Sequence, residues 1–122
     1  MSKRILVVDD EVQLTDMVKM RLETAGYTVS CAYDGIEGLE KAKKEKPDLI
    51  ILDLMLPKMD GYKVCGLLKN DARYAKIPVV MFTARAQDED IGLAGQLGAS
   101  AYITKPFDPK LLLGKIKELL GE

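Results

Sequence analysis

The chain has 122 residues, of which 48% are hydrophobic and 30% charged, a composition typical of one globular domain in water. The net charge of −1 provides no basic surface for nucleic acid, and the longest apolar stretches fall far short of the roughly 20 residues that span a bilayer. The first apolar run follows directly after residue 4, which leaves no room for a signal peptide. We therefore expect a cytoplasmic protein that binds neither nucleic acid nor membrane.

The histidine and cysteine contents restrict the chemistry further. The chain has no histidine, which excludes a histidine metal site, a Ser-His-Asp triad and a phosphohistidine of its own. A phosphohistidine that takes part in its chemistry must therefore belong to another protein. Cys31 and Cys65 do not form a CxxC pair, and we expect both to be small hydrophobic residues of the core.

The first third of the chain alternates between strand and helix patterns, starting with an apolar strand at 5–8. A helix is predicted over about 11–25, and a strand follows over 28–32. A second helix is predicted over 35–45, because Asp34 and Glu37 have the spacing of a capping box and Pro47 follows its end. The expected inward face of the first helix consists of Leu14, Met17, Val18, Leu22 and Ala25.

The middle of the chain contains the most apolar strand. Residues 49–52 are continuously apolar, as expected for a strand that is buried on both faces of a sheet. Pro57, Asp60 and Gly61 then form a turn into a third helix. The inward residues of that helix are expected to be Val64, Cys65 and Leu68.

The last third of the chain repeats the alternation twice. A fourth strand begins after Pro78, a fourth helix covers about 87–97 and ends at Gly98, and a fifth strand ends before Lys105. Asp108 caps a final helix that has Pro109 in its first position. The inward residues of the final helix are expected to be Leu112, Ile116, Leu119 and Leu120.

This alternation predicts the fold class. Strands that alternate with helices form right-handed βαβ crossovers and a parallel sheet covered on both sides. We expect a doubly wound α/β fold with a five-stranded parallel sheet in the order 2-1-3-4-5 and five helices. The first and third strands then lie side by side, at the point where the strand order reverses.

Four of the predicted strands end in residues that suit phosphoryl chemistry. Asp9 and Asp10 follow the first strand, Asp53 follows the third, Thr83 ends the fourth and Lys105 follows the fifth. Ligands of open α/β sheets bind at the carboxyl ends of the strands, so these residues are expected to converge at one edge.

The residue types at this edge predict a metal-assisted phosphoryl acceptor. Three neighbouring carboxylates repel one another unless a cation lies between them, and Mg²⁺ is the natural choice. Asp9 or Asp10 alone could simply cap the first helix, but together with Asp53 they favour a metal site. Asp53 has no capping role and suits a nucleophile that forms an aspartyl phosphate.

Lys105 and Thr83 complete the predicted acceptor site. Lys105 would balance the charge, and the Thr83 hydroxyl and the Ala84 backbone N–H would contact phosphoryl oxygens. Taken singly, Lys105 could be a solvated lysine and Thr83 an ordinary strand-end residue. The Lys105–Pro106 bond could be cis, which would aim a side chain, although a trans bond is the commoner case.

These residues resemble the receiver domain of two-component response regulators, the CheY-like fold, over essentially the whole chain. The resemblance rests on Asp9-Asp10, on Asp53 in DLMLPKMDG, on Thr83-Ala84, and on Tyr102 three residues before Lys105-Pro106-Phe107. It implies that Asp53 accepts a phosphoryl group from a histidine kinase, a phosphotransfer protein or acetyl phosphate. It also implies that Mg²⁺ is bound by Asp9, Asp10, Asp53 and the backbone carbonyl of Met55.

The resemblance further implies a switch and an output surface. In the family, the residues that match Thr83 and Tyr102 move together on phosphorylation. The face formed by the fourth helix, the fifth strand and the fifth helix then changes shape and contacts a downstream protein. Met55 and Arg85 resemble the winged-helix transcription-factor branch of the family, in which side chains at these positions flank the path of the hydrolytic water and should tune the phosphate lifetime.

The dimer surface of that branch is not matched. Ser100-Ala101 stands where the branch has an Asp-Asp pair, and Ile91 and Leu93 stand where it tends to have basic residues. We expect an apolar partner surface in place of a charged dimer contact, unless Ile91 or Leu93 simply packs in the core.

The overall expectation is a single receiver domain over 1–122 without an output domain, acting as a signalling switch. It would catalyse only its own phosphorylation and dephosphorylation and would not be a metabolic enzyme. Two alternatives remain open: a receiver taken from a longer, for example DNA-binding, regulator, and a docking module that is not phosphorylated. A haloacid-dehalogenase phosphatase does not fit Asp9-Asp10-Glu11, and a flavin carrier would not place two carboxylates beside its phosphate.

Overall fold

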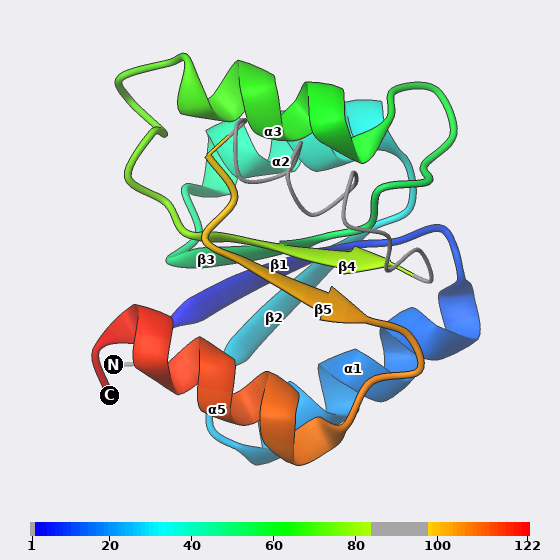
Figure 1. The fold of residues 1–122 in the computed structure, drawn as a ribbon, viewed down its shortest axis with the longest axis vertical. Helices are drawn as coiled ribbons and strands as arrows, with labels where there is room; N and C mark the ends of the chain where they lie inside the picture. The colour runs from blue at the N-terminus through cyan, green and yellow to red at the C-terminus, as the bar shows by residue number, and fades with distance from the viewer. Residues whose placement is uncertain (1, 84–97) are drawn as a thin grey trace.

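The fold is a five-stranded parallel sheet between two layers of helices (Figure 1). The structure is a computed structural model, and it describes residues 2–83 and 98–122. The strand order is β2-β1-β3-β4-β5, which confirms the predicted parallel sheet and its order. The strands are β1 (Arg4–Val8), β2 (Thr28–Ala32), β3 (Leu49–Leu52), β4 (Val79–Thr83) and β5 (Ala101–Thr104).

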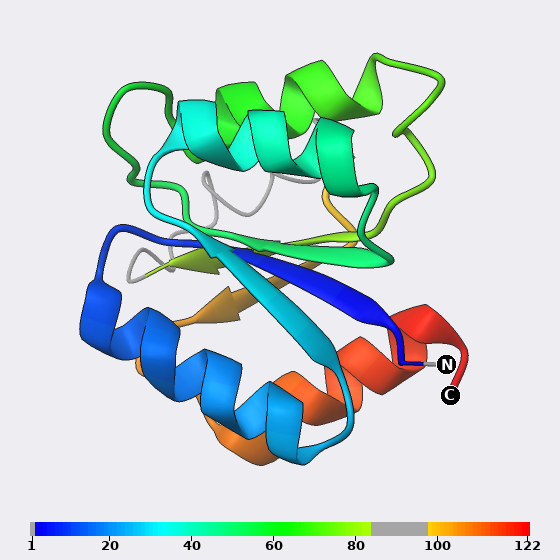
Figure 2. The ribbon, with the colours of Figure 1, turned by 180° about the vertical axis from the view of Figure 1, so that it is seen from behind.

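The described helices cover both faces of this sheet. Their bounds are α1 (Val12–Thr24), α2 (Gly35–Glu45), α3 (Gly61–Lys69) and α5 (Pro109–Leu120). Helices α2 and α3 lie on one face, and α1 and α5 lie on the other (Figures 1 and 2). The fourth of the five predicted helices, over 87–97, lies outside the described residues. None of the helices in the described part is long and apolar enough to cross a membrane.

The core lies on both faces of the sheet because successive strand residues point to opposite sides. Leu6, Ile50 and Met81 belong to the cluster beneath α2 and α3. Ile51 and Phe82 belong to the cluster above α1 and α5. This two-sided burial explains why the strands are apolar without alternation. The two cysteines are free thiols: Cys65 is buried in the first cluster, and the half-buried Cys31 packs against the second.

Helix α1 corrects one sequence prediction. Its buried residues are Thr15, Val18 and Leu22. Met17, which was expected to face the core, is 45% exposed, and Ala25 is exposed. The Thr15 hydroxyl is satisfied by the carbonyl oxygens of Asp9 and Glu11, at 3.2 and 2.8 Å. A polar side chain bonded in this way can occupy a core position. The buried face of α1 therefore includes Thr15 and leaves out Met17 and Ala25.

The other helix starts follow the sequence more closely. Asp34 accepts a hydrogen bond from the Glu37 backbone N–H, and Asp108 caps α5 with Pro109 in the first turn. The predicted capping box of α2 is only half formed, because the Glu37 carboxylate accepts from the Tyr33 amide rather than from that of Asp34.

Candidate functional site

The carboxyl ends of β1 and β3 bring the predicted acidic residues together. The two strands are neighbours, and Asp9 and Asp53 follow their last residues. One carboxylate oxygen from each of Asp9, Asp10 and Asp53 lies within 4.8 Å of the others. Asp9 and Asp53 are only 1% and 4% exposed, whereas Asp10 is exposed. The cluster therefore opens to solvent on the side of Asp10.

Lys105, which follows β5, contacts this cluster with its ammonium group. Its Nζ lies 2.7 Å from Asp9 Oδ2 and 3.3 Å from Asp53 Oδ2. The lysine side chain is 11% exposed and lies over the Phe82 ring at 5.4 Å. The Lys105–Pro106 peptide bond is cis. The predicted meeting of carboxylates and lysine at one edge of the sheet is therefore observed.

Glu11 is a member of this site that the sequence reasoning did not single out. Its Oε1 lies 2.9 Å from the Lys105 Nζ. The only sequence signal was its position as the third acidic residue in a row after the first strand.

The backbone around Asp53 is held tightly. The Asp53 N–H donates to the Val8 carbonyl at 2.9 Å, and the Met55 N–H donates to Asp53 Oδ1 at 3.2 Å. Gly61, at the start of α3, lies against the same backbone, and a Cβ there would come within 2.0 Å of the Asp53 carbonyl oxygen. Only glycine allows α3 to begin so close to Asp53. The sheet and α3 together fix the position of this carboxylate.

The electrostatics of the site are those of a cluster with too many negative charges. Burial and the neighbouring Asp9 carboxylate raise the pKa of Asp53 to about 6, against the lowering effect of Lys105. Burial also raises the pKa of Asp9. For Lys105, burial opposes the charged form, but pairing with Asp9, Glu11 and Asp53 holds its pKa above the usual value. The ammonium therefore stays charged and binds the cluster together.

The donor set fits a hard divalent cation. Asp9 Oδ2 is buried and accepts no hydrogen bond from the described residues, although the Lys105 Nζ lies 2.7 Å away. The contact is a close ion pair. A buried carboxylate oxygen that is held by an ion pair and lies beside two further carboxylates is the kind of ligand that Mg²⁺ binds.

The predicted switch residues are placed only in part. Thr83 is the last residue of β4 and pairs in register with Thr104, but its side chain is not described. Tyr102 on β5 is half-buried and packs against the cluster beneath α2 and α3. The predictions for Ala84, Arg85, Ile91 and Leu93 lie outside the described residues. The coupling of Thr83 to Tyr102 stays a prediction.

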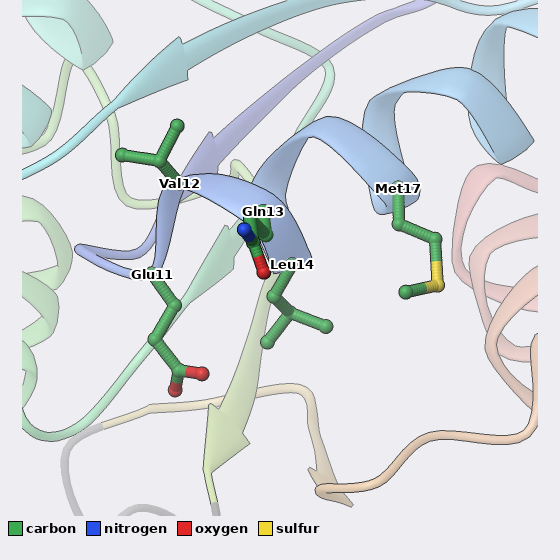
Figure 3. Close-up of a pocket in the computed structure, with 5 residues that line it drawn as sticks. All are labelled: Glu11, Val12, Gln13, Leu14 and Met17. Atoms are coloured by element: carbon green, nitrogen blue, oxygen red, sulfur yellow. The ribbon is translucent and has the colours of Figure 1, made fainter.

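A hollow of about 490 Å³ lies at the first turns of α1 (Figure 3). It is lined by Glu11, Val12, Gln13, Leu14 and Met17. The lining residues include none of Asp9, Asp10 and Asp53, so the acidic cluster and this hollow are separate features, joined by the contact of Glu11 with Lys105.

The doubly wound fold and the acidic cluster define a class of protein in which a ligand or phosphoryl group binds at the carboxyl edge of the sheet. The family model described as "Response regulator receiver domain" matches residues 5–117, and the chain belongs to this family.

Two relatives match nearly all of the chain. The chain is 49% identical over 117 residues to the DNA-binding dual master transcriptional regulator RpaA of Synechocystis sp. This alignment covers 96% of the chain and 48% of RpaA. The chain is 46% identical over 120 residues to the alkaline phosphatase synthesis transcriptional regulatory protein PhoP of Bacillus subtilis, covering 98% of this chain and 49% of PhoP. The chain thus spans about half the length of either regulator.

Solved structures agree with the fold along their whole length. Chemotaxis protein CheY4 of Vibrio cholerae superposes with a TM-score of 0.92 at 33% identity, covering 98% of this chain and 99% of CheY4. The receiver domain of sensor histidine kinase PA1611 of Pseudomonas aeruginosa, solved with a magnesium ion coordinated in its active site cleft, has a TM-score of 0.91 at 27% identity, with 100% of both chains covered.

Proposed function

We propose that this chain is the phosphoryl-accepting switch of a two-component signalling system, with Asp53 as the acceptor. The observation that carries the proposal is the contact of a buried Asp53 with Lys105, beside the Asp9 and Asp10 carboxylates. The phosphoryl donor is a partner histidine kinase or phosphotransfer protein, since the chain has no histidine of its own. Membership of the receiver family supports this assignment.

In this proposal Mg²⁺ is held by Asp9, Asp10, Asp53 and the Met55 backbone carbonyl. The magnesium ion in the PA1611 receiver supports the choice of metal. When bound, Mg²⁺ neutralises the charge that develops on a transferring phosphoryl group.

The side chains of the site divide the remaining work. Because the pKa of Asp53 is about 6, its carboxylate is ionised at neutral pH and can attack phosphorus. The new bond joins an Asp53 oxygen to phosphorus, while the bond from phosphorus to the donor's imidazole nitrogen, or to acetate oxygen, breaks. Lys105 balances the added charge, and Thr83 and the Ala84 N–H contact the phosphoryl oxygens. The chain catalyses only this modification and the hydrolysis of the aspartyl phosphate, in which water attacks phosphorus, the bond to the Asp53 oxygen breaks and inorganic phosphate leaves.

The output of the switch is a protein contact. Tyr102 follows the movement of Thr83, and the face formed by β5, α5 and the fourth helix expected from the sequence then changes its fit to a downstream protein. We place this domain in the cytoplasm, where a histidine kinase presents its phosphoryl group, with no direct contact to nucleic acid or membrane.

A second candidate is the receiver domain of a longer transcriptional regulator. The observation that favours it is that the chain spans 48% of RpaA and 49% of PhoP. The residues of the acceptor site have the same roles in both candidates. In the second, DNA binding would belong to a part of the protein other than residues 1–122.

Acetyl phosphate and intact-mass spectrometry test the proposed function. With Mg²⁺, the wild-type chain should gain one phosphoryl group, and chelation of the metal should prevent it. Asp53→Ala should remain unmodified, whereas the matched variant Asp48→Ala, at the opposite edge of the sheet, should be modified like the wild type. An unmodified wild-type chain, or an Asp53→Ala variant that is modified as fully, would refute the site assignment.

A further inference from the structure

Glu11 directly precedes helix α1, but its side chain does not cap the helix. It is the N-cap of α1, yet its carboxylate makes no capping hydrogen bond. Its backbone is fixed instead: the N–H donates to Asp9 Oδ1 at 2.9 Å, and the carbonyl accepts from the Thr15 amide at 2.9 Å. The carboxylate is therefore available to a distant partner, and it contacts the Lys105 ammonium at 2.9 Å.

Lys105 occupies the oxygens that a divalent cation needs. Its ammonium lies 2.7 Å from the buried Asp9 Oδ2 and 3.3 Å from Asp53 Oδ2. A cation that binds Asp9 must displace the lysine from this oxygen, because two positive charges cannot share it closely. The displaced ammonium remains largely buried and needs another anion within reach.

Glu11 has the geometry to be that anion. Its side chain is 61% exposed at the rim of the cluster, while that of Lys105 is 11% exposed inside it. Glu11 and Val12 point to opposite sides of the start of α1 (Figure 3), and most of the Glu11 side chain is open to solvent. The carboxylate can therefore follow the ammonium as it moves.

We infer that Glu11 is a positioning residue that takes over the Lys105 ammonium when a divalent cation binds Asp9. The inference rests on the proposed function, because it assigns the cation to the Asp9, Asp10 and Asp53 cluster. Glu11 thereby strengthens cation binding although it is not a ligand. It acts through Lys105, and a purely long-range attraction between an exposed carboxylate and the cation would not require the lysine.

Calorimetric titration with Mg²⁺ alone separates these two effects. Glu11→Gln keeps the backbone bonds and removes the ion pair, and the Mg²⁺ dissociation constant should rise about five-fold, as expected for the loss of a partly exposed ion pair. The matched control is Asp16→Asn, which removes an exposed carboxylate from the same helix. Asp16→Asn should raise the dissociation constant by less than about two-fold, because distant exposed charges are screened.

The Lys105→Met background shows whether the effect passes through the lysine. Without an ammonium to displace, Glu11→Gln should weaken Mg²⁺ binding no more than Asp16→Asn does. Equal effects of Glu11→Gln and Asp16→Asn in the wild-type background would overturn the inference, as would a Glu11→Gln effect that persists in Lys105→Met. The comparison of Glu11→Gln with Asp16→Asn in the wild-type background tests the inference even if Lys105→Met does not fold. A wild-type chain that binds no Mg²⁺ would overturn the proposed function itself, together with this inference.

Discussion

The two edges of the sheet use the same charged residue types in different ways. At the amino-terminal edge, the Asp48 carboxylate accepts a hydrogen bond from the Arg4 amide at 2.7 Å. The Lys69 ammonium donates to the carbonyl oxygens of Ala75 and Ile77, at 3.1 and 2.5 Å. Each of these charges is paired with backbone groups, so it holds one loop or strand in place.

At the carboxyl edge the charges meet one another. Asp9 and Asp53 share the Lys105 ammonium, which lies 2.7 Å from Asp9 Oδ2 and 3.3 Å from Asp53 Oδ2. Burial lowers the pKa of Lys69, whereas its anionic partners hold that of Lys105 above the usual value. A charge bonded only to the backbone stabilises the fold, whereas Asp9 and Asp53, which also share an ammonium, can exchange that partner for an ion or a phosphoryl group.

Replacing one lysine at each edge should give opposite results. Lys105→Met removes the only cation that contacts Asp53 in the described part of the chain, and phosphorylation by acetyl phosphate should slow by about 100-fold. Lys69→Met should leave that rate unchanged and lower the free energy of unfolding by about 1–2 kcal/mol, because two carbonyl groups lose their donor. Intact-mass kinetics and urea unfolding measure the two quantities. If Lys69→Met slowed phosphorylation as much as Lys105→Met, the distinction between the edges would fail.

Stability at low pH should depend on the carboxyl edge. The pKa of Asp53 is raised from 3.8 to about 6, so its ionisation disfavours the folded state. The stabilisation that protonated Asp53 contributes is complete below pH 3.8 and is lost as the pH rises through 6, a loss of about 3 kcal/mol. Urea unfolding in the presence of a chelator should show this fall in the wild type, and Asp53→Asn should remove it. An identical pH profile for the two proteins would contradict the assigned electrostatics.

Magnesium should stabilise the carboxyl edge only. At ten times its dissociation constant, Mg²⁺ should raise the free energy of unfolding by about 1.4 kcal/mol. Asp9→Asn should lose most of this increase, whereas Asp48→Asn should retain it. Urea unfolding with and without Mg²⁺ provides the measurement, and an equal loss in both variants would show that the ion is not bound at this edge.

The sequence predicts this site well where backbone topology decides it. Asp9 and Asp53 meet because apolar runs predict β1 and β3, and the reversal of strand order makes these strands neighbours. Asp108 and Pro109 likewise mark the start of α5, because their roles are local.

The sequence predicts side-chain partners less well. The contact between Glu11 and Lys105 joins residues that are 94 positions apart, and it depends on rotamers that the sequence pattern does not encode. The burial of Thr15 depends on hydrogen bonds to two particular carbonyl groups, so a rule based on apolar residues selected Met17 instead. In both cases a polar side chain finds a specific partner, and hydrophobic periodicity carries no information about such partners.

The most direct test of the account is to locate the phosphoryl group. The wild-type chain is treated with acetyl phosphate and Mg²⁺, reduced with borohydride, which converts an aspartyl phosphate to homoserine, and analysed by tandem mass spectrometry after digestion. The account predicts homoserine at position 53 and nowhere else. Homoserine at position 9, 10 or 48, or its absence from the whole chain, would contradict the assignment of Asp53 as the acceptor.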